Sequence, residues 1–139
     1  MNFLVDTNVV SEWVKPRPNP GVVAWLAETN EDQVFLSVVT LAELRHGIDR
    51  MAAGRRQRQL SAWLENELSR RFEGRVLSID GAIADACGKL VARSEEAGRP
   101  IEAMDAFLAA TAQVHQLTLV TRNTAHFHSI LKALLNPWT

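Results

Sequence analysis

The chain has 139 residues, of which 47% are hydrophobic, and these figures suit one ordinary domain built around one core. Its single cysteine, Cys87, excludes an intramolecular disulfide and any cysteine-based zinc cluster, and its apolar neighbours at helical spacing predict a buried thiol. The formal net charge is −1; there is no signal-peptide pattern and no apolar run of the roughly 20 residues that a membrane helix needs, so we expect a cytoplasmic protein.

Short apolar segments alternate with segments of helical periodicity in the first half of the chain. Residues 2–5 are expected to form a buried strand, and a helix over 8–14 should follow it. A second helix is predicted after Asn19-Pro20, because an N-cap residue followed by proline is a typical helix start. Residues 34–38 are rich in β-forming side chains and predict a second strand, with a helix from Thr40 onward.

The second half of the chain repeats this alternation. After Gly54, apolar residues recur every three or four positions, which predicts an amphipathic helix that ends at Gly74. The remaining predicted elements are strands over 75–79 and 117–121, helices that begin near Gly81 and Ile101, a short helix near 124–134 and an edge strand in the tail 136–138.

This order of elements predicts an α/β fold in a single domain over residues 1–139. We expect a three-layer sandwich, in which a mainly parallel sheet of four to five strands has helices on both faces. Crossovers in such sheets are right-handed, and the carboxyl ends of the strands meet at one edge. Asp6, Glu43 and residues 121–123 each follow a strand within a few positions and are therefore expected at that edge.

Three acids are candidate functional residues, although each also has a structural explanation. Asp6 would cap the helix that follows it, and Glu43 would complete a capping box with Thr40. Asp105 would lie favourably at the positive end of its helix, yet its neighbours are almost all apolar. Carboxylates that converge on one sheet edge repel one another, and a hard divalent cation, magnesium or manganese, would explain the use of acids there.

Other catalytic patterns are missing from the sequence. The four histidines form no HExxH pair, no serine has a G-x-S-x-G setting, and the seven glycines form no phosphate-binding loop. A phosphoryl-accepting aspartate is a further possibility, but Asp6 has no second aspartate beside it. The histidines are expected to be exposed or hydrogen-bonded locally.

Two surface features each allow more than one interpretation. Residues 45–75 contain eight arginines, which form either a solvated helix face or a surface that contacts phosphate or an acidic partner. The helices before residue 75 also carry an apolar surplus, which is explained by core packing, by a homodimer face or by a groove for a partner's helix. Val22, Val23, Trp25, Leu26, Trp63 and Leu64 make up this surplus.

Four segments, taken together, resemble a known family. They are Phe3–Glu12, Ser37–Gly47, Met104–Ala112 and Thr118–Asn123, and the closing Asn136-Pro137-Trp138 is also similar. Their order and spacing resemble PIN-domain ribonucleases, specifically toxins of the VapC type and their FitB-like branch. The resemblance extends over nearly the whole chain, and the first and third segments together are its most specific part.

The resemblance implies a metal-dependent endoribonuclease that is the toxin of a type II toxin–antitoxin system. Such a protein would cleave RNA, pair with a small DNA-binding antitoxin and form a homodimer or a higher assembly. It implies that Asp6, Glu43 and Asp105 bind Mg²⁺ or Mn²⁺, which acidifies water and neutralises charge on the scissile phosphate. Asn123 falls at the fourth catalytic position, and Asn8 and Thr121 are expected to orient the carboxylates or the waters around the metal.

The chain departs from the family pattern at this fourth position. The family often has aspartate where this chain has Asn123, and many FitB-like members have an acid three residues later, where this chain has His126. Glu102, one helical turn before Asp105, is either a partial substitute or a solvated side chain. The missing carboxylate leaves an alternative open, a PIN-like module that binds RNA or a protein partner without turnover.

Overall fold

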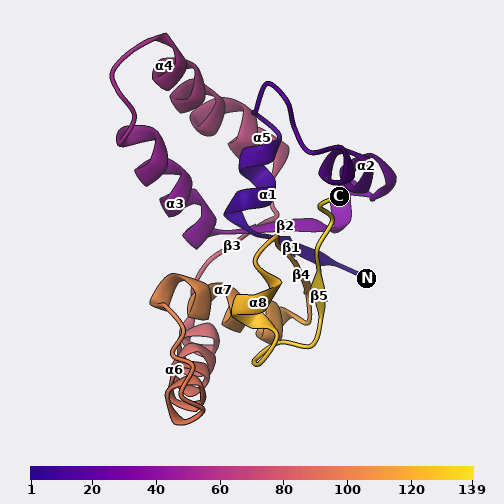
Figure 1. Ribbon diagram of the computed structural model, residues 1–139. Coiled ribbons are helices and arrows are strands. Elements are labelled where there is room, and N and C mark those ends of the chain that lie inside the picture. Colours follow the sequence, from indigo (N-terminus) through magenta and orange to yellow (C-terminus); the bar gives the residue numbers. More distant parts are fainter.

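A sheet of five parallel strands lies at the centre of the molecule. The computed structural model describes residues 1–139, and the strand order is β3-β2-β1-β4-β5 (Figure 1). All four strand pairings are parallel, which confirms the predicted sheet. The strands are β1 (Phe3–Val5), β2 (Val34–Ser37), β3 (Val76–Leu77), β4 (Thr118–Val120) and β5 (Leu134–Leu135).

Helices cover both faces of this sheet, so the predicted three-layer sandwich is confirmed (Figure 1). One face carries α1 (Thr7–Glu12), α2 (Pro20–Glu28), α3 (Val38–Asp49), α4 (Arg55–Ala62) and α5 (Ser69–Arg71). The other face carries α6 (Gly81–Glu96), α7 (Ala103–His115) and α8 (Thr124–Phe127). None of these helices combines the length and the apolar character needed to cross a bilayer.

The core is divided by the sheet into two apolar clusters. Neighbouring strand residues point to opposite faces, so Leu4 packs with α6 and α7 while Val5 packs with α1, α3 and the α4–α5 segment. Leu119 and Val120 of β4 divide in the same way. The central strands are therefore apolar on both sides, which explains their uninterrupted hydrophobic runs.

Several boundaries differ from those expected. Ser37 caps α3 by accepting a hydrogen bond from the Val39 amide at 3.0 Å, so this helix begins before Thr40 and the predicted capping box is wrong. The segment after Asn123 is helical only to Phe127, and the edge strand β5 precedes the tail 136–138 in which it was expected. A π-helical turn over Trp63–Leu68 joins α4 to α5, within the amphipathic helix predicted for this region.

The carboxyl terminus of the chain is held against the start of α2. Asn19 caps this helix as predicted, accepting hydrogen bonds from the amides of Gly21 at 2.9 Å and Val22 at 3.3 Å. The same carboxamide oxygen accepts a hydrogen bond from the amide of Thr139 at 3.2 Å. One side chain therefore fixes both the helix start and the end of the chain.

Candidate active site

The pairing of β1 with β4 brings Asp6 and Thr121 together. Val5 and Val120 are partners in the parallel register, so the residues that follow them are neighbours at the carboxyl edge of the sheet. The Thr121 hydroxyl donates to Oδ2 of Asp6 at 2.8 Å, and the Thr7 amide donates to Oδ1 at 2.7 Å. Asp6 therefore caps α1 and also lies at the sheet edge, so both functions considered for it are compatible.

Glu43 reaches the same edge from α3. The Thr7 hydroxyl donates to Oε1 of Glu43 at 2.7 Å, and the side chain is half-buried. Glu43 does not bond back to Thr40, because α3 begins earlier and Glu43 lies in its second turn. Thr7 links two of the candidate acids, through its amide and its hydroxyl, yet its sequence position indicates only the start of a helix.

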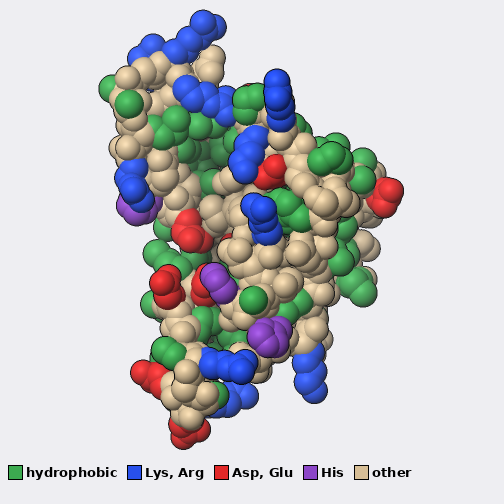
Figure 2. Space-filling model, viewed as in Figure 1, with side chains coloured by type: hydrophobic (Ala, Val, Ile, Leu, Met, Phe, Trp, Pro, Cys, Tyr) green, Lys and Arg blue, Asp and Glu red, His purple; other side chains and the backbone are tan.

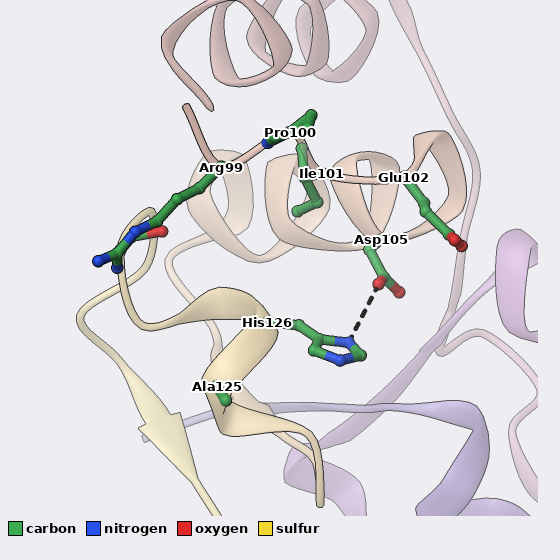
Figure 3. Close-up of a pocket in the computed structure, with 8 residues that line it drawn as sticks. Arg99, Pro100, Ile101, Glu102, Asp105, Ala125 and His126 are labelled. Carbon is green, nitrogen blue, oxygen red and sulfur yellow. Dashed lines mark ion pairs between the residues drawn. The ribbon is translucent and has the colours of Figure 1, made fainter. Parts of the chain in front are cut away.

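Asp105 lies in the first turn of α7, and its side chain is 28% exposed. His126 of α8 faces it, with Nδ1 at 3.6 Å from Oδ2 (Figure 3). Glu102 precedes α7 in the N-cap position, is exposed and forms no capping hydrogen bond. His126 was expected only as an exposed or locally bonded residue, and its contact with an acid on another helix is a tertiary feature that spacing does not reveal.

Asn8 and Asn123 both contact Thr121. The Asn8 carboxamide donates to the Thr121 hydroxyl oxygen at 3.4 Å and accepts from the Arg122 amide at 3.4 Å. The Asn123 amide donates to the same Thr121 oxygen at 3.0 Å, whereas its side chain is exposed and does not cap α8. Thr121 is therefore the centre of a small network that positions Asp6.

The three acids are coupled electrostatically. Burial is the main cause that raises the pKa of Asp6, of Glu43 and of Asp105 above the ordinary carboxyl range. The charges of Asp6 and Asp105 further raise the pKa of Glu43, and the charge of Asp6 raises that of Asp105. Hydrogen bonds from Thr121 and Thr7 and the charge of His126 act in the opposite direction on the pKa of Asp6.

These acids lie near one another without forming a tight cluster. Figure 2 shows acidic side chains beside a histidine where the two helical layers meet, on the face of the molecule that it displays. In this arrangement no three His, Cys, Asp or Glu side chains are close enough together to hold one metal ion. The donor set consists of hard oxygen ligands, whose charge a divalent cation would neutralise.

The sequence and the fold both match known proteins. The PIN domain family model matches residues 3–130. Toxin FitB of Neisseria gonorrhoeae is 39% identical over 98% of each chain, and plasmid stability protein StbB of Pseudomonas syringae pv. tomato is 41% identical over 98% of each chain. VapC ribonuclease Y4jK of Sinorhizobium fredii is 36% identical over 98% of this chain and 97% of its own.

Solved structures agree with these relatives. The crystal structure of FitAcB from Neisseria gonorrhoeae superimposes with a TM-score of 0.92, at 39% identity over 98% of each chain. The structure of FitAB bound to a DNA fragment gives a TM-score of 0.92 at 36% identity, over 99% of this chain and 96% of that one. With a family model matched across most of its length and relatives this similar, the chain belongs to the PIN-domain family.

Proposed function

We propose that this chain is a metal-dependent endoribonuclease and acts as the toxin of a toxin–antitoxin pair. Two observations support the proposal: Thr7 donates hydrogen bonds to both Asp6 and Glu43, and Asp105 lies near enough for its charge to raise the pKa of Glu43. The names of similar proteins, which include a VapC ribonuclease and a FitB toxin, support the same activity.

The candidate acids suit Mg²⁺ or Mn²⁺ by their chemistry. Hard carboxylate oxygens are the ligands that these ions prefer, and no thiolate lies among them that would favour zinc. Because no three of the side chains are gathered tightly enough for one ion, we expect Asp6, Glu43 and Asp105 to be drawn together when a cation binds. The bound ion would acidify water and neutralise charge on a scissile phosphate.

The chain's own residues would hold these acids in place. Thr121 and the Thr7 amide each occupy one lone pair of Asp6, which leaves further lone pairs on both oxygens for a ligand. The Thr7 hydroxyl holds Oε1 of Glu43 and leaves Oε2 available. In hydrolysis, water attacks phosphorus, the bond from phosphorus to the 3′ oxygen breaks, and the products are a 5′-phosphate and a 3′-hydroxyl.

We place Asn123 in a supporting position, because its exposed side chain lies at the carboxyl edge of β4 but holds neither an acid nor the start of α8. Asn8 and Thr121 would orient Asp6, since both belong to the network that ends on its carboxylate. Removing these supporting contacts should weaken metal binding less than removing an acid.

The proposed partners follow from similar proteins and from the activity. Solved neighbours include toxin–antitoxin complexes, such as FitAB bound to DNA, and we propose a small DNA-binding antitoxin as the partner of this chain. An RNA substrate would place the activity in the cytoplasm. Val23 is 46% exposed while Val22 and Leu64 are buried, so only part of the apolar surplus is available for a homodimer or a larger assembly.

A second candidate function is a PIN-like module that binds RNA or a partner without turnover. The open arrangement of the acids favours it, together with a histidine in place of an acid at position 126. The two functions differ in one respect that can be measured, because only the nuclease cleaves RNA when Mg²⁺ or Mn²⁺ is added.

The deciding experiment compares Asp105→Asn with Asp85→Asn. Asp85 is an exposed acid on the neighbouring helix α6, paired with Lys89 at 2.9 Å, and provides a matched control. We expect Asp105→Asn to retain its circular dichroism spectrum but to lose at least about 100-fold in RNA cleavage and most of its stabilisation by Mn²⁺. Full activity in Asp105→Asn would refute the site, and wild-type protein that binds RNA but never cleaves it would favour the second function.

A further inference from the structure

A pocket of about 350 Å³ opens beside Asp105, between the segment that precedes α7 and the helix α8 (Figure 3). Neither Asp6 nor Glu43 lines this pocket, so it extends the acidic site rather than repeating it. Its volume is at the lower end of the range of small-molecule pockets, about 300–1,000 Å³, which suits one nucleotide rather than a helix or a strand of a partner protein.

The wall of the pocket that precedes α7 is fixed to the end of α6. Ser94 is buried, and its backbone carbonyl accepts from the Arg99 amide at 2.9 Å while its hydroxyl accepts from the Ile101 amide at 3.3 Å. Gly98 turns the chain with φ of +71°, a conformation that side chains disfavour. Ile101 also packs against the apolar cluster beneath, so this wall is preformed.

The pocket has opposite charges at its two ends. Figure 3 shows Arg99 at one end and Glu102 at the other, with the Asp105–His126 pair between them. Arg99 belongs to none of the ion pairs within the chain, so its guanidinium is available to an external anion. Pro100 and Ile101 provide an apolar surface between the charged ends.

We propose that this pocket binds one nucleotide of single-stranded RNA next to the scissile phosphate. The base would rest on Pro100 and Ile101, Ser129 would offer a hydroxyl to its polar edge, and Arg99 would bind the flanking phosphate. A base within a duplex is stacked and paired and has no access to such a pocket, which makes the site selective for unpaired strands. This inference rests on the proposed ribonuclease function.

The test measures RNA binding separately from cleavage. A fluorescent single-stranded heptanucleotide is titrated by anisotropy, in EDTA and in a Glu43→Gln background, so that nothing is cut. We expect Arg99→Ala to weaken binding about tenfold and to reduce the slope of log K against log salt by about 0.7, the loss of one phosphate contact. Ser129→Trp should fill the pocket and weaken binding similarly.

Two controls decide the outcome. Arg70→Ala removes an exposed arginine from α5, on the other face of the sheet, and should change affinity by less than about twofold. Thermal melting checks that Arg99→Ala and Ser129→Trp remain folded. Equal affinity in wild type, Arg99→Ala and Ser129→Trp would overturn the inference, as would an equal loss in Arg70→Ala or no RNA binding by the wild type. Cleavage failure alone would instead count against the proposed function.

Discussion

The hydrogen bond from Thr121 to Asp6 can be measured by comparison with two other buried threonines. The hydroxyl of Thr121 donates to the Asp6 carboxylate, that of Thr111 donates to the Phe107 carbonyl within α7 at 2.8 Å, and that of Thr40 has no partner. All three residues are at most 1% exposed. Replacing each by valine keeps the shape of the side chain and removes only the hydroxyl, so the three variants differ mainly in the hydrogen bonds that are lost: three at Thr121, one at Thr111 and none at Thr40.

The expected order follows from these partners. Thr121→Val loses a bond to a charged group and also the oxygen that accepts from Asn8 and from the Asn123 backbone amide, so it should cost at least about 2 kcal/mol of the free energy of unfolding. Thr111→Val should cost less than about 1 kcal/mol, since the Phe107 carbonyl belongs to the helix ladder, and Thr40→Val should gain about 1 kcal/mol. For a chain of this length each kcal/mol shifts the melting temperature by about 3 °C.

Thermal melting and urea titration at several pH values test this order. The Thr121 hydroxyl lowers the pKa of Asp6, so it stabilises the ionised carboxylate and its loss should cost more above the pKa of Asp6 than below it. The cost of Thr111→Val should not change with pH. If Thr121→Val cost no more than Thr111→Val, or if its cost were the same at every pH, the proposed network around Asp6 would be wrong.

Two further predictions concern the packing around glycines and the charge of Glu43. Gly21→Ala would place a methyl group against the Pro137 carbonyl and 2.7 Å from Cγ2 of Thr139, so it should cost about 1–3 kcal/mol, whereas Gly47→Ala, with open space in α3, should gain about 0.5–1 kcal/mol in thermal melts. Glu43→Gln keeps an oxygen for the Thr7 hydroxyl and removes a carboxylate whose ionised form burial disfavours, so it should stabilise the metal-free protein at pH 7 but not at pH 4. Urea titrations that showed the opposite pH dependence would contradict the raised pKa of Glu43.

The sheet and the acid at its edge were predictable because their signals are local. The apolar run before Asp6 predicts a buried strand, and parallel pairing then places Asp6 at the carboxyl edge wherever its partner strand lies. The apolar neighbours of Asp105 indicate an acid that points inward, and its side chain is 28% exposed in the structure. Both inferences need only the hydrophobic periodicity of the strand or helix and the end of that element at which the acid lies.

Glu43 was harder to place because two local patterns compete at its position. Thr40 and Glu43 have the spacing of a capping box, but Ser37 caps the helix three residues earlier, so the spacing is coincidental. The partner of Glu43 is Thr7, which lies 36 positions away in the chain. Contacts of this kind depend on the packing of α1 against α3, and no periodicity in the sequence specifies them.

Most partners of the arginines in residues 45–75 are also long-range contacts that the sequence does not specify. Arg45 is paired with Asp49 and Glu65 at 3.1 Å each, Arg71 pairs with Glu31, and Arg75 donates to backbone carbonyls. These three guanidinium groups are engaged within the fold, whereas Arg50, Arg55, Arg58 and Arg70 belong to none of the ion pairs and stay available to phosphate. Arg99, outside the segment, is likewise free of such contacts.

The raised pKa values of the three acids make the stability of the metal-free protein depend on pH. Because the folded-state pKa of Asp6, Glu43 and Asp105 is raised, the folded chain binds more protons than the unfolded chain between the ordinary carboxyl pKa, about 4, and the raised values. These three groups therefore make the stability of the metal-free protein fall as pH rises through that window. Neutral side chains could provide the same hydrogen bonds without this cost, so stability alone does not explain the three acids, whereas the cation binding that we propose would explain them, since it favours the ionised forms.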